Sequence, residues 1–178
     1  IVAELTQLRS TPSAYAEKIG ARRRYFSGIV LRLPGQVALR TKEGVAALDE
    51  AVRALRELEP LPTLEPSGAL AAAARDHVRD IGPKGLLAHE GTDDSTPSGR
   101  VARYATGFSG IGEVISFGPE EPSAVVIDLI VDDGVRDRGH RKILLDSKLR
   151  FAGAGCGPHA VYRTVCVIDL ADRIEERR

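Results

Sequence analysis

Apolar residues recur at intervals of three and four between Val45 and Leu58, and no other feature of this sequence restricts its fold as strongly. An α-helix completes a turn about every 3.6 residues, so this spacing places them on one helical face. Pro60 has no amide hydrogen to continue the helix. The sequence therefore predicts an amphipathic helix from about Thr41 to Pro60. Its stripe consists of Val45, Leu48, Val52, Leu55 and Leu58.

Further helices are predicted on both sides of this one. Ser67 can cap a helix whose small-residue face extends to Ile81, where Gly82 and Pro83 would end it. Apolar residues at helical spacing also occur from Val2 to Leu8, and Thr11 followed by a proline predicts a second helix start. Shorter helices are expected at 99–104, 122–132 and 139–145.

The end of the chain has the pattern of β-structure. Residues 112–117 read as a strand, and 151–156 and 161–170 as a hairpin that turns around Gly157 and Pro158. Residues 90–99 have the composition of a surface loop, and 172–178 that of a frayed charged tail. Between 20 and 40, the run Arg22 to Arg24 is typical of a solvated face, and Ile29 to Leu39 of an extended arm broken at Pro34 and Gly35. Helices come first and strands mixed with helices follow. This order favours an α+β layered fold over a doubly wound sheet, in a single domain over residues 1–171.

The two cysteines, Cys156 and Cys166, lie on the two expected strands of this hairpin. Antiparallel pairing could bring them opposite each other and form a disulfide, which is typical of oxidising compartments. Two buried thiols are the alternative. The chain begins at Ile1 and contains no methionine. We therefore expect that a preceding segment has been removed, either a cleaved secretion signal or an artificially trimmed end.

Charge and hydropathy argue against two classes of partner. Lys and Arg total 25 and Asp and Glu total 25, so the net charge of zero gives no overall field that would attract nucleic acid. No apolar run approaches the roughly 18 residues that a membrane span needs. We expect a soluble globular protein that binds no nucleic acid and does not cross a membrane.

Several familiar motifs are absent or incomplete. The glycines at 153, 155 and 157 are followed by Pro158, where a phosphate-binding loop would begin a helix. His89 and Glu90 would resemble a zinc-protease helix only if position 93 were His, and it is Asp93. The acidic residues at 132 and 133 lack the remaining ligands of a calcium loop.

A small set of polar residues at the ends of expected elements remains: His89, Glu113, Asp132 or Asp133, and His140. Imidazole and carboxylate groups that converge can hold zinc, and the same groups can transfer protons without a metal. His77 lies on the apolar face of its helix, which indicates a core histidine. Ser109 and Ser116 lie near Glu113, but nothing marks either as a nucleophile.

Pieces of the sequence resemble bacterial members of the CAP superfamily (cysteine-rich secretory proteins, antigen 5 and pathogenesis-related proteins), in the family's order. The residues are Glu4 to Tyr15, Leu61 to His77 around Ala74-Arg-Asp-His77, His89, Ser98-Gly-Arg100-Val101, Gly112-Glu113-Val114 and Asp132 to Arg141, which ends Gly-His140-Arg141. The resemblance extends from residue 1 to about 171. It implies a single-domain three-layer α-β-α sandwich, which agrees with the element order.

The resemblance also implies a site. His89 corresponds to the first histidine of the family's cavity and Glu113 to its Gly-Glu-Asn motif, in which Val114 replaces Asn. The second histidine is His140, with His159 as the alternative. Asp132, or Asp133, stands near the position of a second acidic residue. We expect a metal site of His89, Glu113, His140 and Asp132, with zinc as the candidate ion.

Family members differ in reported roles, so the resemblance does not fix the function. The favoured hypothesis is a secreted or extracytoplasmic binding module whose polar His/Glu cavity takes a divalent metal, a small molecule, a lipid or a cell-envelope partner. A metal-dependent hydrolase acting on peptide or cell-wall bonds is the alternative, and a scaffold with a vestigial cavity is the third hypothesis. A lipid carrier would need an apolar groove, which a sequence does not reveal.

Overall fold

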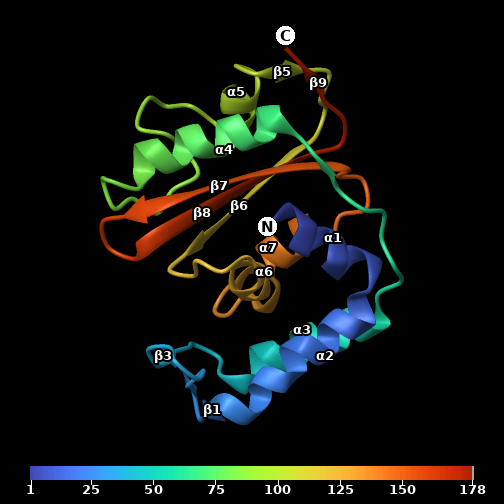
Figure 1. Cartoon of the computed structure of the whole chain (residues 1–178), viewed down its shortest axis with the longest axis vertical. Coiled ribbons are helices and arrows are strands. Elements are labelled where there is room, and N and C mark those ends of the chain that lie inside the picture. Colours follow the sequence, from blue (N-terminus) through green and yellow to red (C-terminus); the bar gives the residue numbers. More distant parts are fainter. Residues whose placement is uncertain (178) are drawn as a thin grey trace.

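A computed structural model describes residues 1–177 and places a four-stranded sheet between layers of helices (Figure 1). The helices are α1 (Val2–Ser10), α2 (Pro12–Gly20), the 3-10 helix η1 (Ala21–Tyr25), α3 (Val45–Glu57), α4 (Gly68–Ile81), α5 (Pro97–Val101), α6 (Pro122–Val131) and α7 (Gly139–Leu144). The central sheet consists of β4 (Glu65–Pro66), β7 (Phe151–His159), β8 (Arg163–Ala171) and β6 (Ile111–Phe117), in that spatial order. Short strands lie outside it: β1 (Phe26–Ser27), β2 (Val30–Leu31), β3 (Leu39–Arg40), β5 (Ala105–Thr106) and β9 (Glu175–Glu176).

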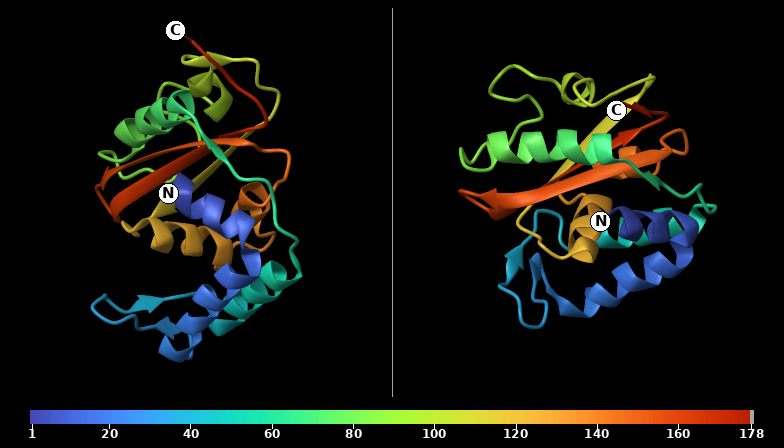
Figure 2. Two further views of the ribbon diagram at one scale, coloured as in Figure 1. Left: turned by 45° about the vertical axis from the view of Figure 1, so that its right-hand side comes forward. Right: turned by 45° about the horizontal axis from the view of Figure 1, so that its top comes forward.

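Helices cover both faces of the sheet. α4 and α5 lie on one face, and α1, α6 and α7 lie on the other, with α2 and α3 packed farther out (Figures 1 and 2). The larger apolar core lies on the second side and joins these helices to the sheet through Val114, Ile168 and Leu170. The predicted α+β sandwich is therefore confirmed, as is the amphipathic helix α3, whose Leu48 and Leu55 are buried in this core.

The β7–β8 hairpin turns three residues later than the sequence suggested. Gly157 and Pro158 are paired residues of β7, and the turn occupies 160–162. The His159 side chain explains the shift, because its Nδ1 accepts hydrogen bonds from the amides of Val161 and Tyr162. An imidazole that satisfies turn amides stabilises the reversal at that point.

Cys156 and Cys166 are directly opposite each other in the hairpin and form a disulfide. The first of the two alternatives for the cysteines is therefore correct. The bond joins two strands that the backbone ladder already pairs.

Glycines on one face of β7 let α4 approach the sheet closely. A Cβ at Gly153 would lie 2.1 Å from the amide nitrogen of Ala71, and one at Gly155 would lie 2.8 Å from that of Arg75. At Gly157 it would lie 2.7 Å from Val78. The glycine-rich segment that does not fit a phosphate loop is thus a packing surface for a helix.

The starts of α4 and α2 differ. The Ser67 hydroxyl accepts a hydrogen bond from the Leu70 amide, as predicted for a helix cap. α2 begins at Pro12 as expected, but the Thr11 hydroxyl does not cap it. That hydroxyl donates to the carbonyl of Gln7 and so closes the end of α1.

Residues 172–177 of the charged tail have a defined structure, contrary to the prediction that the tail frays, and Arg178 lies outside the described residues. β9 pairs with β5, and the Glu176 carboxylate accepts hydrogen bonds from the Ser67 hydroxyl and the Ala69 amide at the start of α4. A carboxylate there satisfies free amides at the positive end of the helix dipole. The arm predicted at 29–39 contains β2 and reaches β3 of the β1–β2–β3 sheet, and η1 precedes it. Within 1–177, no helix has the length and hydropathy to span a membrane.

We predict that Gly153→Ala lowers the free energy of unfolding by about 2 to 3 kcal/mol, because the added methyl group forces α4 away from β7. Gly20→Ala is the matched control, since a Cβ there meets only Val52 at 3.8 Å in ordinary contact, and it should change stability by less than about 0.5 kcal/mol. Urea unfolding of both variants measures the difference. Equal stabilities would contradict the packing role.

Candidate functional site

The Glu113 carboxylate is hydrogen-bonded to two side chains, His89 and Arg100, on the side of the sheet covered by α4 and α5. It is the third residue of β6, and strand alternation directs its side chain to the same face as Ile111 and Ile115, which pack on α4. One carboxylate oxygen lies 2.7 Å from Nδ1 of His89, and the other accepts a 2.5 Å hydrogen bond from Arg100 of α5. Glu113 and Arg100 are buried, whereas about half of the His89 side chain is exposed.

This cluster carries strong electrostatic effects. Burial alone would raise the pKa of Glu113, but hydrogen bonds from His89 and Arg100 and the charge of Arg100 hold it below its usual range. Asp169 lies opposite Glu113 on β8 and is fully buried. Burial, followed by the charge of Glu113, raises the Asp169 pKa well above its ordinary value. The charge of ionised Glu113 is thus neutralised by its ion pair with Arg100, whereas the raised pKa of Asp169 favours the neutral carboxyl group.

His140 and Asp132 form a second pair at the junction of α6 and α7. Asp132 ends α6 in the left-handed conformation, with φ of 57°, and is buried. Its Oδ1 lies 2.7 Å from Nδ1 of His140, and its Oδ2 accepts a 3.0 Å hydrogen bond from the His140 amide in the first turn of α7. The hydrogen bond to Asp132 raises the pKa of His140.

The four predicted ligands therefore form two pairs in different layers. His89 and Glu113 belong to the α4/α5 side of the sheet, while His140 and Asp132 belong to the α6/α7 side. Over residues 1–177, no three His, Cys, Asp or Glu side chains gather in an arrangement that could hold a metal ion. Hydrogen bonds already occupy the oxygens of both carboxylates. As placed, these residues do not fit a shared zinc ion.

The other two histidines have structural contacts. Nε2 of His77 lies 2.8 Å from the carbonyl of Ala88, and burial lowers the His77 pKa, so the core role expected for it is supported. His159, the alternative second site histidine, stabilises the β7–β8 turn through its Nδ1. Its Nε2 lies 3.2 Å from the carbonyl oxygen of Leu86.

The remaining polar candidates also contact the scaffold. Asp133 accepts hydrogen bonds from the amides of Lys42 and Glu43, just before α3. Ser109 donates to Asp172, and Ser116 donates to Asp128 at 2.8 Å. In the part of the chain that the structure describes, neither serine is hydrogen-bonded to a histidine, so neither forms a Ser–His pair.

A groove of about 690 Å³ lies between the β1–β3 arm and α6 and was not predicted from the sequence. Its volume is in the range of small-molecule sites. Apolar side chains form most of its walls: Phe26, Leu31, Leu33, Val37, Leu39, Leu48, Phe117, Ala124, Ile127, Val131 and Tyr162. The only sequence signal was the arm itself, and nothing in the sequence shows that it folds back over α6.

Seven charged residues line this groove: Arg22, Arg40, Glu120, Glu121, Asp128, Asp133 and Arg163. Arg22 is half-buried, burial lowers its pKa, and within the described chain its guanidinium has neither a hydrogen bond nor an ion pair. Asp128 is surrounded by protein but open to solvent through the groove, and its pKa is raised by this burial. Arg22 is the half-buried cation of the groove, because Arg40 and Arg163 are exposed.

Comparison with known proteins gives a consistent picture. The family model of the cysteine-rich secretory protein family, CAP, matches residues 50–169. An extracellular protein with an SCP domain from Bacillus anthracis is similar in structure, with 23% identity, a TM-score of 0.52, and coverage of 64% of this chain and 35% of the other. An outer surface protein from Borrelia burgdorferi has 18% identity, a TM-score of 0.54, and coverage of 64% of this chain and 80% of the other. The chain thus spans about a third of the Bacillus protein. No curated protein matches the sequence.

We predict that Glu113→Gln destabilises the protein by about 3 kcal/mol or more, because it leaves the buried Arg100 cation without its carboxylate. The control, Glu120→Gln, breaks an exposed pair with Arg163 and should cost less than about 1 kcal/mol. Urea unfolding compares the two. An equal decrease in the free energy of unfolding in both variants would show that the buried Glu113–Arg100 pair stabilises the protein no more than the exposed pair does.

The raised pKa of His140 predicts a pH dependence. The pKa of His140 is near 6.5 in the unfolded chain and higher in the folded protein. The stabilisation by protonated His140 is therefore complete below about pH 6.5 and is lost as the pH rises through the pKa of the folded protein. Asp132→Asn should lower the His140 pKa, so its stability deficit relative to the native chain should be largest below about pH 6.5 and shrink above it. NMR titration and unfolding at several pH values test this.

Asp133→Asn is the matched control, because Asp133 bonds the Lys42 and Glu43 amides instead of His140. It should leave the His140 titration nearly unchanged. An unshifted His140 pKa in Asp132→Asn would refute the assignment of Asp132 as the cause.

Proposed function

We propose that this chain, which belongs to the cysteine-rich secretory protein (CAP) family, is a secreted binding module for an amphipathic ligand. The ligand has an apolar chain and an anionic head group, and it occupies the groove between the β1–β3 arm and α6. The single observation that carries this proposal is a large, mostly apolar groove that contains a half-buried cation, Arg22, with no hydrogen bond or ion pair to the described residues.

The groove walls support an apolar chain as the occupant. Exposed apolar side chains are costly in water, and Leu39 and Val37 on the arm are 56% and 89% exposed. A ligand chain seated between them and α6 would remove this surface from water, at about 25 cal/mol for each Å² buried.

Arg22 supports an anionic head group. A half-buried guanidinium without a carboxylate partner retains its full donor capacity, and arginine binds carboxylate or phosphate through paired donors. Asp128 disfavours its own ionised form, which reduces its repulsion toward an anion. A fatty-acid carboxylate and a lipid phosphate both have the required chemistry.

Location outside the cytoplasm is part of this proposal. The Cys156–Cys166 disulfide is typical of oxidising compartments, and the two similar structures are described as extracellular and outer surface proteins. Hydrolysis has less support, because the carboxylates of both His pairs are occupied and neither Ser109 nor Ser116 contacts a histidine.

Binding of cis-parinaric acid, a fluorescent fatty acid, and its displacement by palmitate test the proposal. We expect saturable binding by the native chain and about 10- to 100-fold weaker binding by Arg22→Gln, which loses a charged hydrogen bond. Leu33→Asp should abolish binding by placing a charge in the apolar wall.

Arg24→Gln is the matched control, because Arg24 is exposed and does not line the groove. Hexadecanol, which has the chain without the charge, should displace the probe equally from native protein and Arg22→Gln. Absence of saturable binding by the native chain would refute the proposal, and equal palmitate affinity in Arg22→Gln would refute the role of the head group.

A further inference from the structure

Exposed apolar side chains gather at one end of the molecule. They come from the β2–β3 arm, the loop after α4 and the β7–β8 turn, which lie on the same side of the molecule in each view (Figures 1 and 2). Val161 is 66% exposed and Leu87 is 57% exposed, in addition to Val37 and Leu39 of the arm. We call the surface formed by these four residues together with Leu86 and Tyr162 the apolar end.

Contacts between the segments show that the apolar end is one surface. The loop after α4 packs on the β7–β8 turn, since the Ala160 amide donates to Gly82 and Nε2 of His159 lies 3.2 Å from the Leu86 carbonyl. Tyr162 of the turn lines the same groove as Val37 and Leu39 of the arm. The exposed apolar patch is thus formed by several segments that are distant in sequence, and not by one loop.

The arm beside this surface is strongly basic. Residues 18–42 contain seven Lys and Arg and no Asp or Glu, in a chain whose net charge is zero. Arg23 and Lys18 pair with acids of neighbouring helices. Arg32 and Arg40 are exposed and have no ion pair with any residue that the structure describes. Cations that the fold does not neutralise remain available to an external anionic surface.

The combination identifies the partner by its chemistry. A soluble polyanion would be bound by the cations alone and would leave the apolar residues exposed. An anionic lipid bilayer satisfies both groups, because phosphate head groups attract Arg and Lys while apolar side chains enter the interface beneath them. Among the acids beside the arm, Glu120 is paired with Arg163, and Asp133 accepts hydrogen bonds from the amides of Lys42 and Glu43.

We propose that the apolar end and the basic arm form a docking surface for anionic lipid bilayers. Docking is distinct from ligand binding in the groove, because Leu87, Val161, Arg24 and Arg32 do not line the groove. It would, however, place the groove mouth, bordered by Val37 and Tyr162, against the bilayer.

Sedimentation with vesicles tests the docking surface. We expect the native chain to bind vesicles of phosphatidylcholine and phosphatidylglycerol in equal parts, to bind pure phosphatidylcholine much less, and to dissociate as salt is raised. Arg24→Gln/Arg32→Gln should weaken binding about 30-fold, at about tenfold for each 1.4 kcal/mol. Leu87→Ser/Val161→Ser should weaken it about tenfold or more.

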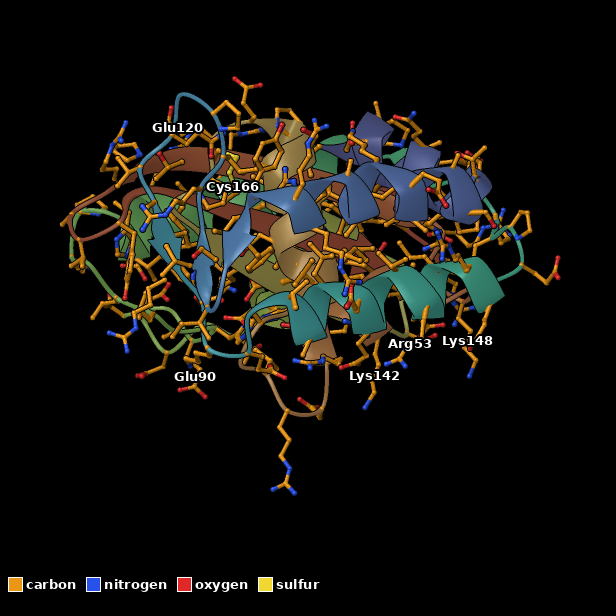
Figure 3. The ribbon with its side chains drawn as sticks, turned by 90° about the horizontal axis from the view of Figure 1, so that it is seen from below. Arg53, Glu90, Glu120, Lys142, Lys148 and Cys166 are labelled. Carbon is orange, nitrogen blue, oxygen red and sulfur yellow. A yellow bond between two sulfur atoms is a disulfide. The ribbon has the colours of Figure 1, made fainter. Side chains whose placement is uncertain are left out.

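Arg53→Gln/Lys148→Gln is the matched control, since both are exposed cations at the opposite end, away from Glu120 and the arm (Figure 3). It should bind vesicles as the native chain does, and thermal melts confirm that every variant is folded. Equal binding to both vesicle types, or native-like binding by either double variant, would overturn the proposal. So would binding to soluble polyphosphate that exceeds binding to the vesicles, because it would identify a polyanion surface.

Failure here is separable from failure in the groove. Arg24→Gln/Arg32→Gln should still bind cis-parinaric acid, whereas Arg22→Gln should still bind vesicles to within about fivefold, because it removes only one of several cations.

Discussion

The close approach of α4 to the glycine face of β7 determines where the other elements lie. Gly153, Gly155 and Gly157 bring the helix backbone against the sheet, and Gly82 continues this contact beyond the helix, where a Cβ would lie 2.3 Å from the carbonyl of Pro158. The chain therefore leaves α4 beside the β7–β8 turn. From there, the loop brings His89 over Glu113 at the edge of the sheet. A helix held farther out would not allow this contact.

Local patterns in the sequence predicted most of the fold. The spacing of Val45, Leu48 and Leu55 predicted α3, and Ser67 predicted the start of α4. Strand alternation predicted the hairpin that brings the two cysteines together. The errors arose where distant groups decide the outcome. The hairpin turn depends on the His159 imidazole, and the tail is ordered because Glu176 meets the start of α4. Neither contact leaves a local signature.

One site of His89, Glu113, His140 and Asp132 was expected, and its division into two pairs was not predicted. His89 with Glu113 and His140 with Asp132 are paired as their residue types suggest, because a buried carboxylate requires a hydrogen-bond donor. Which side of the sheet each pair occupies depends on strand parity and helix placement. Arg100 completes the first pair. It was named only as part of the segment Ser98-Gly-Arg100-Val101, because an arginine in a short helix has the same local pattern whether it is solvated or buried against a carboxylate. The groove depends on the arm folding back over α6, which is a tertiary arrangement.

The charge distribution has a consequence for how the protein moves before it touches anything. Because residues 18–42 carry seven cations and no acids, the rest of the chain, with 18 cations and 25 acids, has a net charge of −7. A neutral molecule with separated charge has a large dipole moment. A charged boundary repels or attracts it little as a whole but exerts a torque on it, so within about a Debye length the molecule would rotate until its cationic end leads. Its orientation would then be set before its approach is complete.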